Sequence, residues 1–423
     1  MDSIHNLTPE IQKRISTFER FLAREGMNRP EVKFTGAILT SMLKKHHVHL
    51  AVLARGLEEK ISPKKTWERL SRHISKRGLH DKLTRSNIKN NKDKICRMRF
   101  CVVDVSDVQK VEAEEMEGLS RVRDGSKSAG GNKTVIGNGY YWLNGVMAEG
   151  EELIPVYSEI YSLDCEGKDH TSENSKILGI TDMIHEVHGE AIFVIDRGGD
   201  RSKLIEPMLS AGKLFVIRGD DQRSLRLHTD SKKATNIEVI ACRTKTPYQF
   251  KSKRNGEIFY VGIRRVYFGA KSMWLVVSRR HRDKNAVSWY LTNIPGSRKQ
   301  VMETVMEAYG LRWRVEEYHR QIKQDYKLEQ ICLRKYSAIK NMCAIVMLAA
   351  SFCARLPYQI VIKMLVATNQ LPCKRLSDIP KYPYYKITAA VAQVMQYTSK
   401  RRPKPLRIRK RDYLQLNLNL CEV

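Results

Sequence analysis

Runs of apolar residues separated by short polar segments predict a set of β-strands in the middle of the chain. The predicted strands are Met98–Asp104, Gly139–Val146, Glu152–Tyr161, Ala191–Asp196 and Leu214–Arg218. Ser172–His188 has helical spacing, with Ser172 as a candidate N-cap, and a second helix is expected to run to about Ala211. Because helices alternate with the later strands, this region is expected to be a mixed α/β domain.

Further along, Tyr309–Lys323 has the residue types of a helix. On a helical projection its apolar stripe consists of Leu311, Val315, Tyr318 and Ile322. Within another arc of about 60° lie Tyr309, Arg312, Glu316 and Lys323. This face would suit a functional site, although ordinary solvated amphipathic helices also show charged faces of this kind.

Between the last core strand and this helix, short β-rich runs alternate with basic turns. They are Ile237–Arg243, Ile258–Phe268, Met273–Ser278 and Ser288–Thr292. The pattern predicts a β-rich insertion over residues 219–295 that interrupts the order of the core.

The N-terminal part is expected to be helical, over Thr35–Lys45 with Thr35 as a candidate cap, Val48–Leu57 and Lys65–Ile74. The last of these is rich in Lys and Arg and follows a break at Ile61–Pro63. It fits a helix-turn-helix or a plain helical hairpin. The polar stretch Thr84–Lys94 is expected to be a linker or basic loop.

At the other end of the chain, Ser337–Ile362 is apolar and helical, broken at Pro357. It is expected to cover the sheet or form a dimer contact, and to be too interrupted for a membrane span. The basic run Lys400–Arg411 is either a solvated tail or a segment that contacts phosphates nonspecifically.

The charge balance indicates a polyanionic partner. The 423 residues include 75 Lys and Arg but only 46 Asp and Glu, a formal net charge of +29. This argues against a typical metabolic enzyme and leaves nucleic-acid binding, ribosome association or a membrane surface. Without a predicted span or signal segment, the expected location is cytoplasmic and nucleoid-associated. The nine cysteines form no CxxC pair, which disfavours zinc and disulfide frameworks, and Cys343 and Cys353 are expected in the core.

Two predicted strands end in a carboxylate, Asp104 and Asp196, and the charged helix face adds Glu316. Asp107 competes with Asp104 for the first position. Such oxygens are the ligands that Mg²⁺ prefers, and pairs of Mg²⁺ ions catalyse in-line phosphoryl transfer. Taken singly, however, an aspartate at the end of a strand is more often a turn residue.

The spacing of Tyr309, Arg312, Glu316 and Lys323 resembles the YREK signature of bacterial insertion-sequence transposases of the IS-four type, which are DDE enzymes. Val103-Asp104-Val105-Ser106 resembles their first-aspartate motif, and Asp196–Asp200 resembles the second. Trp289–Thr292 is similar to a W-x-L-T strand of the family's insertion. The order of predicted elements is also that of the RNase H-like fold, which this family has.

The resemblance implies that Asp104, Asp196 and Glu316 bind Mg²⁺, for which Mn²⁺ can substitute, and catalyse cleavage of transposon ends and joining of their 3′-OH groups to target DNA. Tyr309, Arg312 and Lys323 would hold phosphates of the double-stranded DNA. Arg218 is a further candidate phosphate contact and also fits a plain surface arginine. In members that form hairpins, a Trp such as Trp289 stacks on a flipped base; the alternative is a sheet-core aromatic.

The same resemblance implies a homodimeric synaptic complex and three regions: a helical DNA-binding domain over residues 1–95, a catalytic domain over 96–360 and a basic segment over 361–423. Two alternatives stay open on sequence grounds. One is a metal-dependent nuclease of the same fold that does not transfer strands. The other is a catalytically silent DNA-binding protein.

Overall fold

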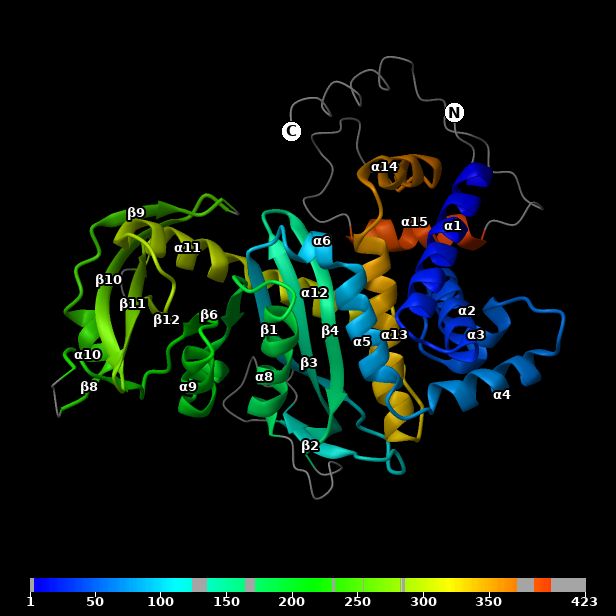
Figure 1. Ribbon diagram of the computed structural model, residues 1–423, viewed down its shortest axis with the longest axis horizontal. Coiled ribbons are helices and arrows are strands. Elements are labelled where there is room, and N and C mark those ends of the chain that lie inside the picture. The colour runs from blue at the N-terminus through cyan, green and yellow to red at the C-terminus, as the bar shows by residue number, and fades with distance from the viewer. Residues whose placement is uncertain are drawn as a thin grey trace, which may run out of the picture. The chain divides into compact units, whose positions relative to one another are not determined.

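The computed structural model describes residues 4–123, 135–163, 172–229, 233–253, 255–281, 283, 286–370 and 384–396. The chain forms two compact units (Figure 1). The sheet unit is Asn87–Arg320, and the helical unit combines Met1–Ser86 with Gln321–Val423. The basic run 400–411 lies outside the described residues.

One mixed sheet forms the centre of the sheet unit, with strand order β2-β3-β1-β5-β6-β12-β11-β10-β9 and β4 paired to β3. Its parallel core is β1, β5 and β6, and the other pairings are antiparallel. The strands are β1 Phe100–Gln109, β2 Ser120–Arg123, β3 Ile136–Glu149, β4 Glu152–Tyr161, β5 Ile192–Ile195, β6 Leu214–Arg218, β9 Tyr248–Lys251, β10 Ile258–Phe268, β11 Lys271–Arg280 and β12 Val287–Thr292. A separate small sheet joins β7 Ser224–Leu225 to β8 Thr235–Asn236.

Helices cover both faces of this sheet. At adjacent positions of β3, a Cβ added to Gly145 would meet Ile180 of α8 at 3.1 Å, whereas Asn144 contacts His319 of α12. Successive strand residues point to opposite faces, so α8 and α12 lie on opposite sides. The helices are α6 Lys92–Ile95, α8 Glu173–His185, η1 Arg197–Gly199, α9 Ser202–Ser210, α10 Ile237–Cys242, α11 Arg298–Leu311 and α12 Trp313–Gln324, which begins in this unit. The mixed α/β architecture confirms the predicted fold class and agrees with an RNase H-like core.

The expected insertion is part of the same sheet. Its last strand, β12, pairs antiparallel with the core strand β6, from Tyr290 opposite Arg218 to Thr292 opposite Val216. The insertion therefore extends the core sheet through β12 into β11, β10 and β9.

The predicted strand over Ile237–Arg243 is wrong, because this segment forms helix α10. The side chain of Asn236 caps the helix by accepting a hydrogen bond from the backbone N–H of Glu238. Ile237, Ile240 and Ala241 are buried at positions three or four residues apart, a spacing that fits one face of a helix.

The described part of the helical unit contains α1 Ile4–Arg24, α2 Arg29–Lys45, α3 Leu50–Gly56, α4 Pro63–Ile74, α5 Leu79–Asn90, which begins in this unit, η2 Leu328–Gln330, α13 Tyr336–Ala354, α14 Tyr358–Ala367 and α15 Tyr384–Gln396. Thr35 is not a cap, since α2 begins earlier with Asn28 and Glu31 in a capping box. The predicted linker over Thr84–Lys94 is also wrong. This stretch lies largely in α5 and α6, and α5 buries Leu83 and Ile88.

Helix α13 is the most apolar long helix described. By length and composition it could cross a membrane, contrary to the sequence expectation, but 78% of its most apolar window is buried inside the protein. Asn341 on α13 donates to the carbonyls of Ile74 and Lys76, at 2.6 and 2.7 Å, and so attaches α13 to the end of α4. Cys343 and Cys353 are buried on α13, as predicted. These contacts are those of a core helix.

Candidate active site

Asp104 and Asp196 occupy equivalent positions on two neighbouring parallel strands. The β1–β5 ladder runs from Phe100 opposite Ile192 to Val103 opposite Ile195. Each aspartate is the next residue after that ladder, which places the two side by side. The prediction that strand β1 ends at Asp104 is wrong, because the antiparallel pairing of β1 with β3 continues to Gln109.

The competing carboxylate, Asp107, lies three residues further along β1. An odd separation places it on the opposite face of the strand from Asp104. Its Oδ2 accepts a hydrogen bond from Gln109 at 2.8 Å. The geometry therefore favours Asp104 as the partner of Asp196.

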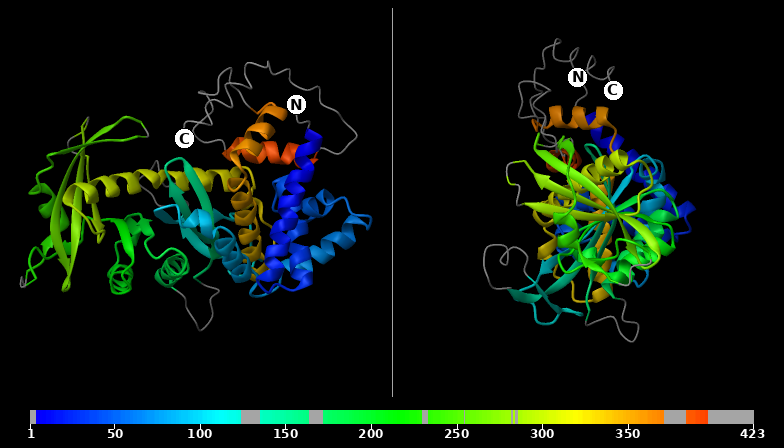
Figure 2. Two further views of the ribbon diagram at one scale, coloured as in Figure 1. Left: turned by 45° about the horizontal axis from the view of Figure 1, so that its top comes forward. Right: turned by 90° about the vertical axis from the view of Figure 1, so that its left-hand side faces the viewer.

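The segment predicted as one helix from Tyr309 to Lys323 consists of two. Helix α11 begins after Ser297, which forms a capping box with Gln300, and α12 continues in nearly the same direction (Figure 2). Arg312 lies between the two helices. Its backbone N–H donates a hydrogen bond to the carbonyl of Tyr309, three residues earlier, and its carbonyl accepts one from the N–H of Val315, three residues later. This tight turn interrupts the regular helix at Arg312. The predicted apolar stripe is buried, as expected: Leu311, Val315, Tyr318 and Ile322.

The guanidinium of Arg312 lies close to three carboxylates that come from three different parts of the fold. Nη1 lies 4.0 Å from Asp104 Oδ2 and 3.7 Å from Asp196 Oδ2, and Nη2 lies 2.6 Å from Glu316 Oε1. The Arg312 side chain is only 20% exposed. The structure thus brings Asp104, Asp196 and Glu316 around one positive group.

Tyr309 and Arg218 extend this cluster. The Tyr309 hydroxyl donates to Asp196 Oδ1 at 3.1 Å, and Arg218 Nη1 donates to the Tyr309 oxygen at 3.4 Å. Burial and the charge of Asp196 raise the pKa of Tyr309 to about 12. Tyr309 therefore keeps its proton at neutral pH and acts as a donor. The Tyr290 ring packs on Tyr309 with centroids 4.6 Å apart.

Asp104 resists ionisation in this environment. Burial is the main cause, and the charges of Asp196 and Glu316 act in the same direction, so its pKa rises to about 7. Arg312 and the backbone N–H of Val105 oppose the rise without cancelling it. An additional cation beside Asp104 would favour the ionised form.

We expect Asp104→Asn to be more stable than the wild type at pH 8 in EDTA. A folded-state pKa near 7, against an ordinary 3.8, gives stability that is present at low pH and is lost as the pH rises through about 7. Since the amide does not ionise and the loss in the wild type begins above the ordinary value of 3.8, the advantage of the variant should grow by about 2–3 kcal/mol between pH 5 and pH 8. Thermal unfolding at both pH values measures this. Equal melting temperatures at pH 8 would contradict it.

The donor chemistry of the cluster suits a hard divalent cation, because all three side chains offer carboxylate oxygens. Within the described ranges, no group of three His, Cys, Asp or Glu side chains lies close enough together to hold a metal ion. The guanidinium of Arg312 stands among the three carboxylates instead. The residues fit a metal in type, and in this arrangement the Arg312 guanidinium occupies the position among them.

Two further predicted residues are engaged elsewhere. Lys323, on the part of α12 that belongs to the helical unit, pairs with Glu329 at 3.0 Å.

Trp289 is half-buried and lies against Gly219. A Cβ added to Gly219 would come within 2.6 Å of the Cδ1 atom of Trp289. Its buried indole N–H has no hydrogen-bond partner among the described residues. In this arrangement Trp289 packs on the sheet, and its proposed DNA contact stays a prediction.

Asp200, the last residue of the second-aspartate motif, is a structural anchor. Its side chain is fully buried and pairs with Arg223 at 2.6 Å. It also accepts the backbone N–H of Asp220 at 2.7 Å, and Arg223 in turn donates to the Asp200 carbonyl at 2.9 Å. These contacts fix the segment that follows β6, next to Arg218.

Two polar residues beside Asp104 were not predicted from the sequence. Asn144 is directly opposite Asp104 on β3 and is fully buried. His319 lies on α12, three residues after Glu316, with Nδ1 4.0 Å from Asp104 Oδ2. The sequence feature that could have pointed to Asn144 is its position as an asparagine within the otherwise apolar strand around Trp142 and Leu143.

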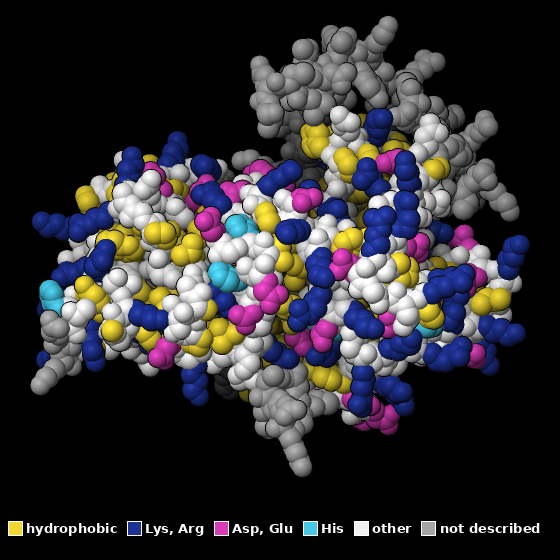
Figure 3. Space-filling model, in the orientation of Figure 1, with side chains coloured by type: hydrophobic (Ala, Val, Ile, Leu, Met, Phe, Trp, Pro, Cys, Tyr) yellow, Lys and Arg dark blue, Asp and Glu magenta, His cyan; other side chains and the backbone are white. Residues whose placement is uncertain are grey.

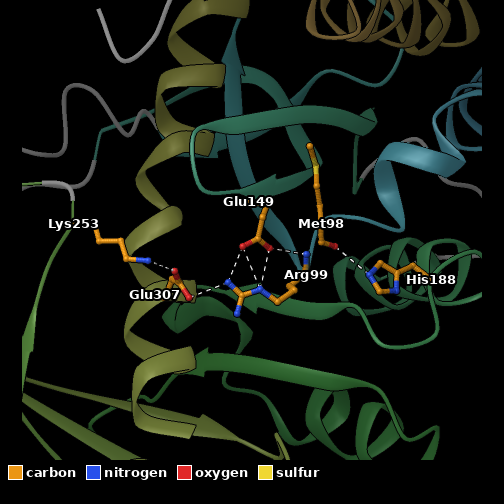
Figure 4. Close-up of polar contacts among 6 residues, drawn as sticks. All are labelled: Met98, Arg99, Glu149, His188, Lys253 and Glu307. Atoms are coloured by element: carbon orange, nitrogen blue, oxygen red, sulfur yellow. Dashed lines mark hydrogen bonds and ion pairs between the residues drawn. The ribbon is translucent and has the colours of Figure 1, made fainter. Parts of the chain in front are cut away.

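An ion-pair network before the start of β1 holds α11 against the sheet (Figure 4). Arg99 pairs with Glu149 at 2.7 Å and with Glu307 of α11 at 2.9 Å. Lys253, from the segment between β9 and β10, also pairs with Glu307 at 3.1 Å. Burial opposes ionisation of Glu307, but the hydrogen bonds from Arg99 and Lys253 outweigh it and lower its pKa. Because α11 leads into Tyr309 and Arg312, this network helps to set the position of the cluster.

Comparison with protein families adds one match. Residues 97–352, more than half of the chain, match the family described as transposase DDE domain. The matched range contains Asp104, Asp196 and Glu316, together with the strands and helices that carry them. No curated protein matches the chain.

Proposed function

The chain belongs to the family of transposase DDE domains, and we propose that it cleaves the ends of a transposable element and joins their 3′-OH groups to target DNA. The observation that supports this most directly is the gathering of Asp104, Asp196 and Glu316 around Arg312. The spacing of Tyr309, Arg312, Glu316 and Lys323 places it, in our proposal, with the IS-four type.

The proposed reaction is two successive in-line displacements at phosphorus. In the first, water attacks and the bond to the 3′ oxygen breaks, which leaves a 3′-OH. In the second, this hydroxyl attacks a target phosphodiester and displaces the target's own 3′ oxygen. Bound Mg²⁺ or Mn²⁺ ions would stabilise the attacking and leaving oxygens. Asp104, Asp196 and Glu316 would hold these ions.

In this proposal the basic residues of the cluster, of which Arg312 pairs with the carboxylates in the structure, bind DNA phosphates once metal ions are present. When cations neutralise the carboxylates, the Arg312 guanidinium becomes available to a DNA phosphate, which it can bind with two parallel hydrogen bonds. Tyr309, still protonated, can donate to a phosphate oxygen, and Arg218 lies beside it. Lys323 would add a point charge further along α12.

We propose that the helical N-terminal region, residues 1–95, binds the transposon ends. Helix α4 buries Leu70 and exposes Lys64, Trp67 and Arg72, with Trp67 43% exposed. On the face that Figure 3 shows, Lys and Arg side chains lie at many places, including the region of α3 and α4. Basic side chains interleaved with an exposed aromatic suit a DNA backbone and its bases. A homodimeric synaptic complex and association with the nucleoid belong to the same proposal.

The test is cleavage of a supercoiled plasmid carrying the element's ends, with purified protein and Mg²⁺ or Mn²⁺. We expect the wild type to nick at the ends and join them to target, and Asp196→Ala to bind the ends without cutting. Cutting without joining would indicate a nuclease instead. Binding without any cutting by the wild type would indicate a catalytically silent DNA-binding protein.

A further inference from the structure

A row of polar side chains crosses three strands beside the carboxylate cluster. Asp104 on β1 is directly opposite Asn144 on β3, which in turn is directly opposite Ser158 on β4. Residues in register on neighbouring strands share a face. Asn144 and Ser158 are almost completely buried, so their polar atoms need partners inside the protein.

Hydrogen bonds along this row have a fixed direction. The indole N–H of Trp142 can only donate, and it donates to Ser158 Oγ at 2.8 Å. The Ser158 hydroxyl then donates to Asn144 Oδ1 at 2.9 Å. Because that oxygen is the acceptor, the amide nitrogen of Asn144 faces His319 Nε2, 3.0 Å away.

This direction determines the tautomer of His319. The Asn144 amide nitrogen is a donor, so Nε2 of His319 must accept and the proton of the neutral ring must lie on Nδ1. The ring is only 8% exposed and packs against Trp142, with centroids 4.8 Å apart. Nδ1 is the nitrogen that lies 4.0 Å from Asp104 Oδ2.

We propose that His319 is a positioning residue for Asp104. Its Nδ1–H holds one carboxylate oxygen of Asp104 through a hydrogen bond that closes when the site is occupied, which leaves the other oxygen for a divalent cation. The distance of 4.0 Å is longer than a hydrogen bond, and such contacts commonly tighten in the working complex. Residues that orient a metal ligand in this way typically change metal affinity or activity ten- to a hundredfold when mutated. The inference rests on the proposed function, since it assigns Asp104 to the metal site.

The first readout needs neither metal nor DNA. In protein labelled with ¹⁵N-histidine, the His319 resonances, assigned by their loss in His319→Gln, should show a protonated Nδ1 and an unprotonated Nε2 at pH 8. Protonation at Nε2 instead would overturn the proposal. Because this measurement is independent of DNA cleavage, its failure is distinguishable from failure of the transposase assignment.

The second readout compares two variants, each of which places a side-chain amide near one of the two nitrogens of the His319 ring. His319→Asn places a donor near Nδ1, whereas His319→Gln places one near Nε2. We expect Mn²⁺ affinity, measured by electron paramagnetic resonance, and single-turnover cleavage to fall about ten- to a hundredfold in His319→Gln and less than about fivefold in His319→Asn.

Thermal unfolding of both variants separates positioning from packing. If both lose Mn²⁺ affinity equally, or only in proportion to their loss of stability, His319 acts merely as a core residue and the proposal is wrong. If both retain wild-type Mn²⁺ affinity, it is also wrong. Rescue by Asn at comparable stability supports it.

Discussion

We expect Glu316→Gln to lower the rates of the proposed cleavage and strand transfer by about a thousandfold or more, while DNA binding is retained. Gln has the same size as Glu but lacks the charge that pairs with Arg312 at 2.6 Å and would help to hold a divalent ion. Charge stabilisation by such an ion is worth several kcal/mol in the transition state, and each 1.36 kcal/mol changes the rate about tenfold. The measurement is single-turnover cleavage of end DNA, with binding followed separately by fluorescence anisotropy.

The neighbouring residue supplies a matched control. Glu317→Gln makes the same chemical change one position along α12, where the carboxylate pairs with Arg320 at 2.8 Å rather than with Arg312. We expect its cleavage rate to stay within about twofold of the wild type. If both variants cut equally well, Glu316 is not a metal ligand and the cluster around Arg312 has another role.

Asp200→Ala should lower the free energy of unfolding by about 3–5 kcal/mol, because it leaves a largely buried guanidinium without its partner. The Asp200 side chain has no exposed surface, and that of Arg223 is only 14% exposed. The variant also removes the acceptor for the Asp220 N–H. Urea unfolding followed by far-UV circular dichroism measures the loss.

The control for this variant lies in the same loop. Asp221 pairs with Arg197 at 3.4 Å, and both side chains are substantially exposed, at 56% and 43%. Asp221→Ala should therefore change stability by less than about 1 kcal/mol. A similar loss in both variants would mean that the loop is sensitive to any change of charge, and that Asp200 has no special part in holding it.

Much of the fold could be predicted from the sequence. Strands 152–161, 214–218 and 258–268 coincide with the predicted ranges, because their apolar runs are bounded by polar or turn-forming residues. The carboxylate positions were also predictable: Asp104 and Asp196 each follow a short buried run. The local sequence pattern is enough to predict an element where the local conformational preference agrees with the tertiary contacts that the segment makes.

Other features depend on contacts that no local pattern contains. The apolar segment at Ile237 forms a helix because Asn236 caps it, although its residue types favour a strand. The pairing of β12 with β6 joins residues some seventy positions apart in the chain. The place of Arg312 among the carboxylates, and of His319 beside Asp104, becomes visible only when α12 lies on the sheet.

The continuity of the sheet through β6 and β12 has a consequence for aggregation. If the insertion that contains β12 were deleted, the backbone of β6 at Val216, Ile217 and Arg218 would become an unpaired edge that could bind a strand of another molecule. In the intact chain the sheet ends on this side with β9, a strand of only four residues, Tyr248–Lys251, followed by basic residues. Short, charged edge strands resist such pairing. The insertion therefore protects the sheet against self-association, whatever part it takes in binding DNA.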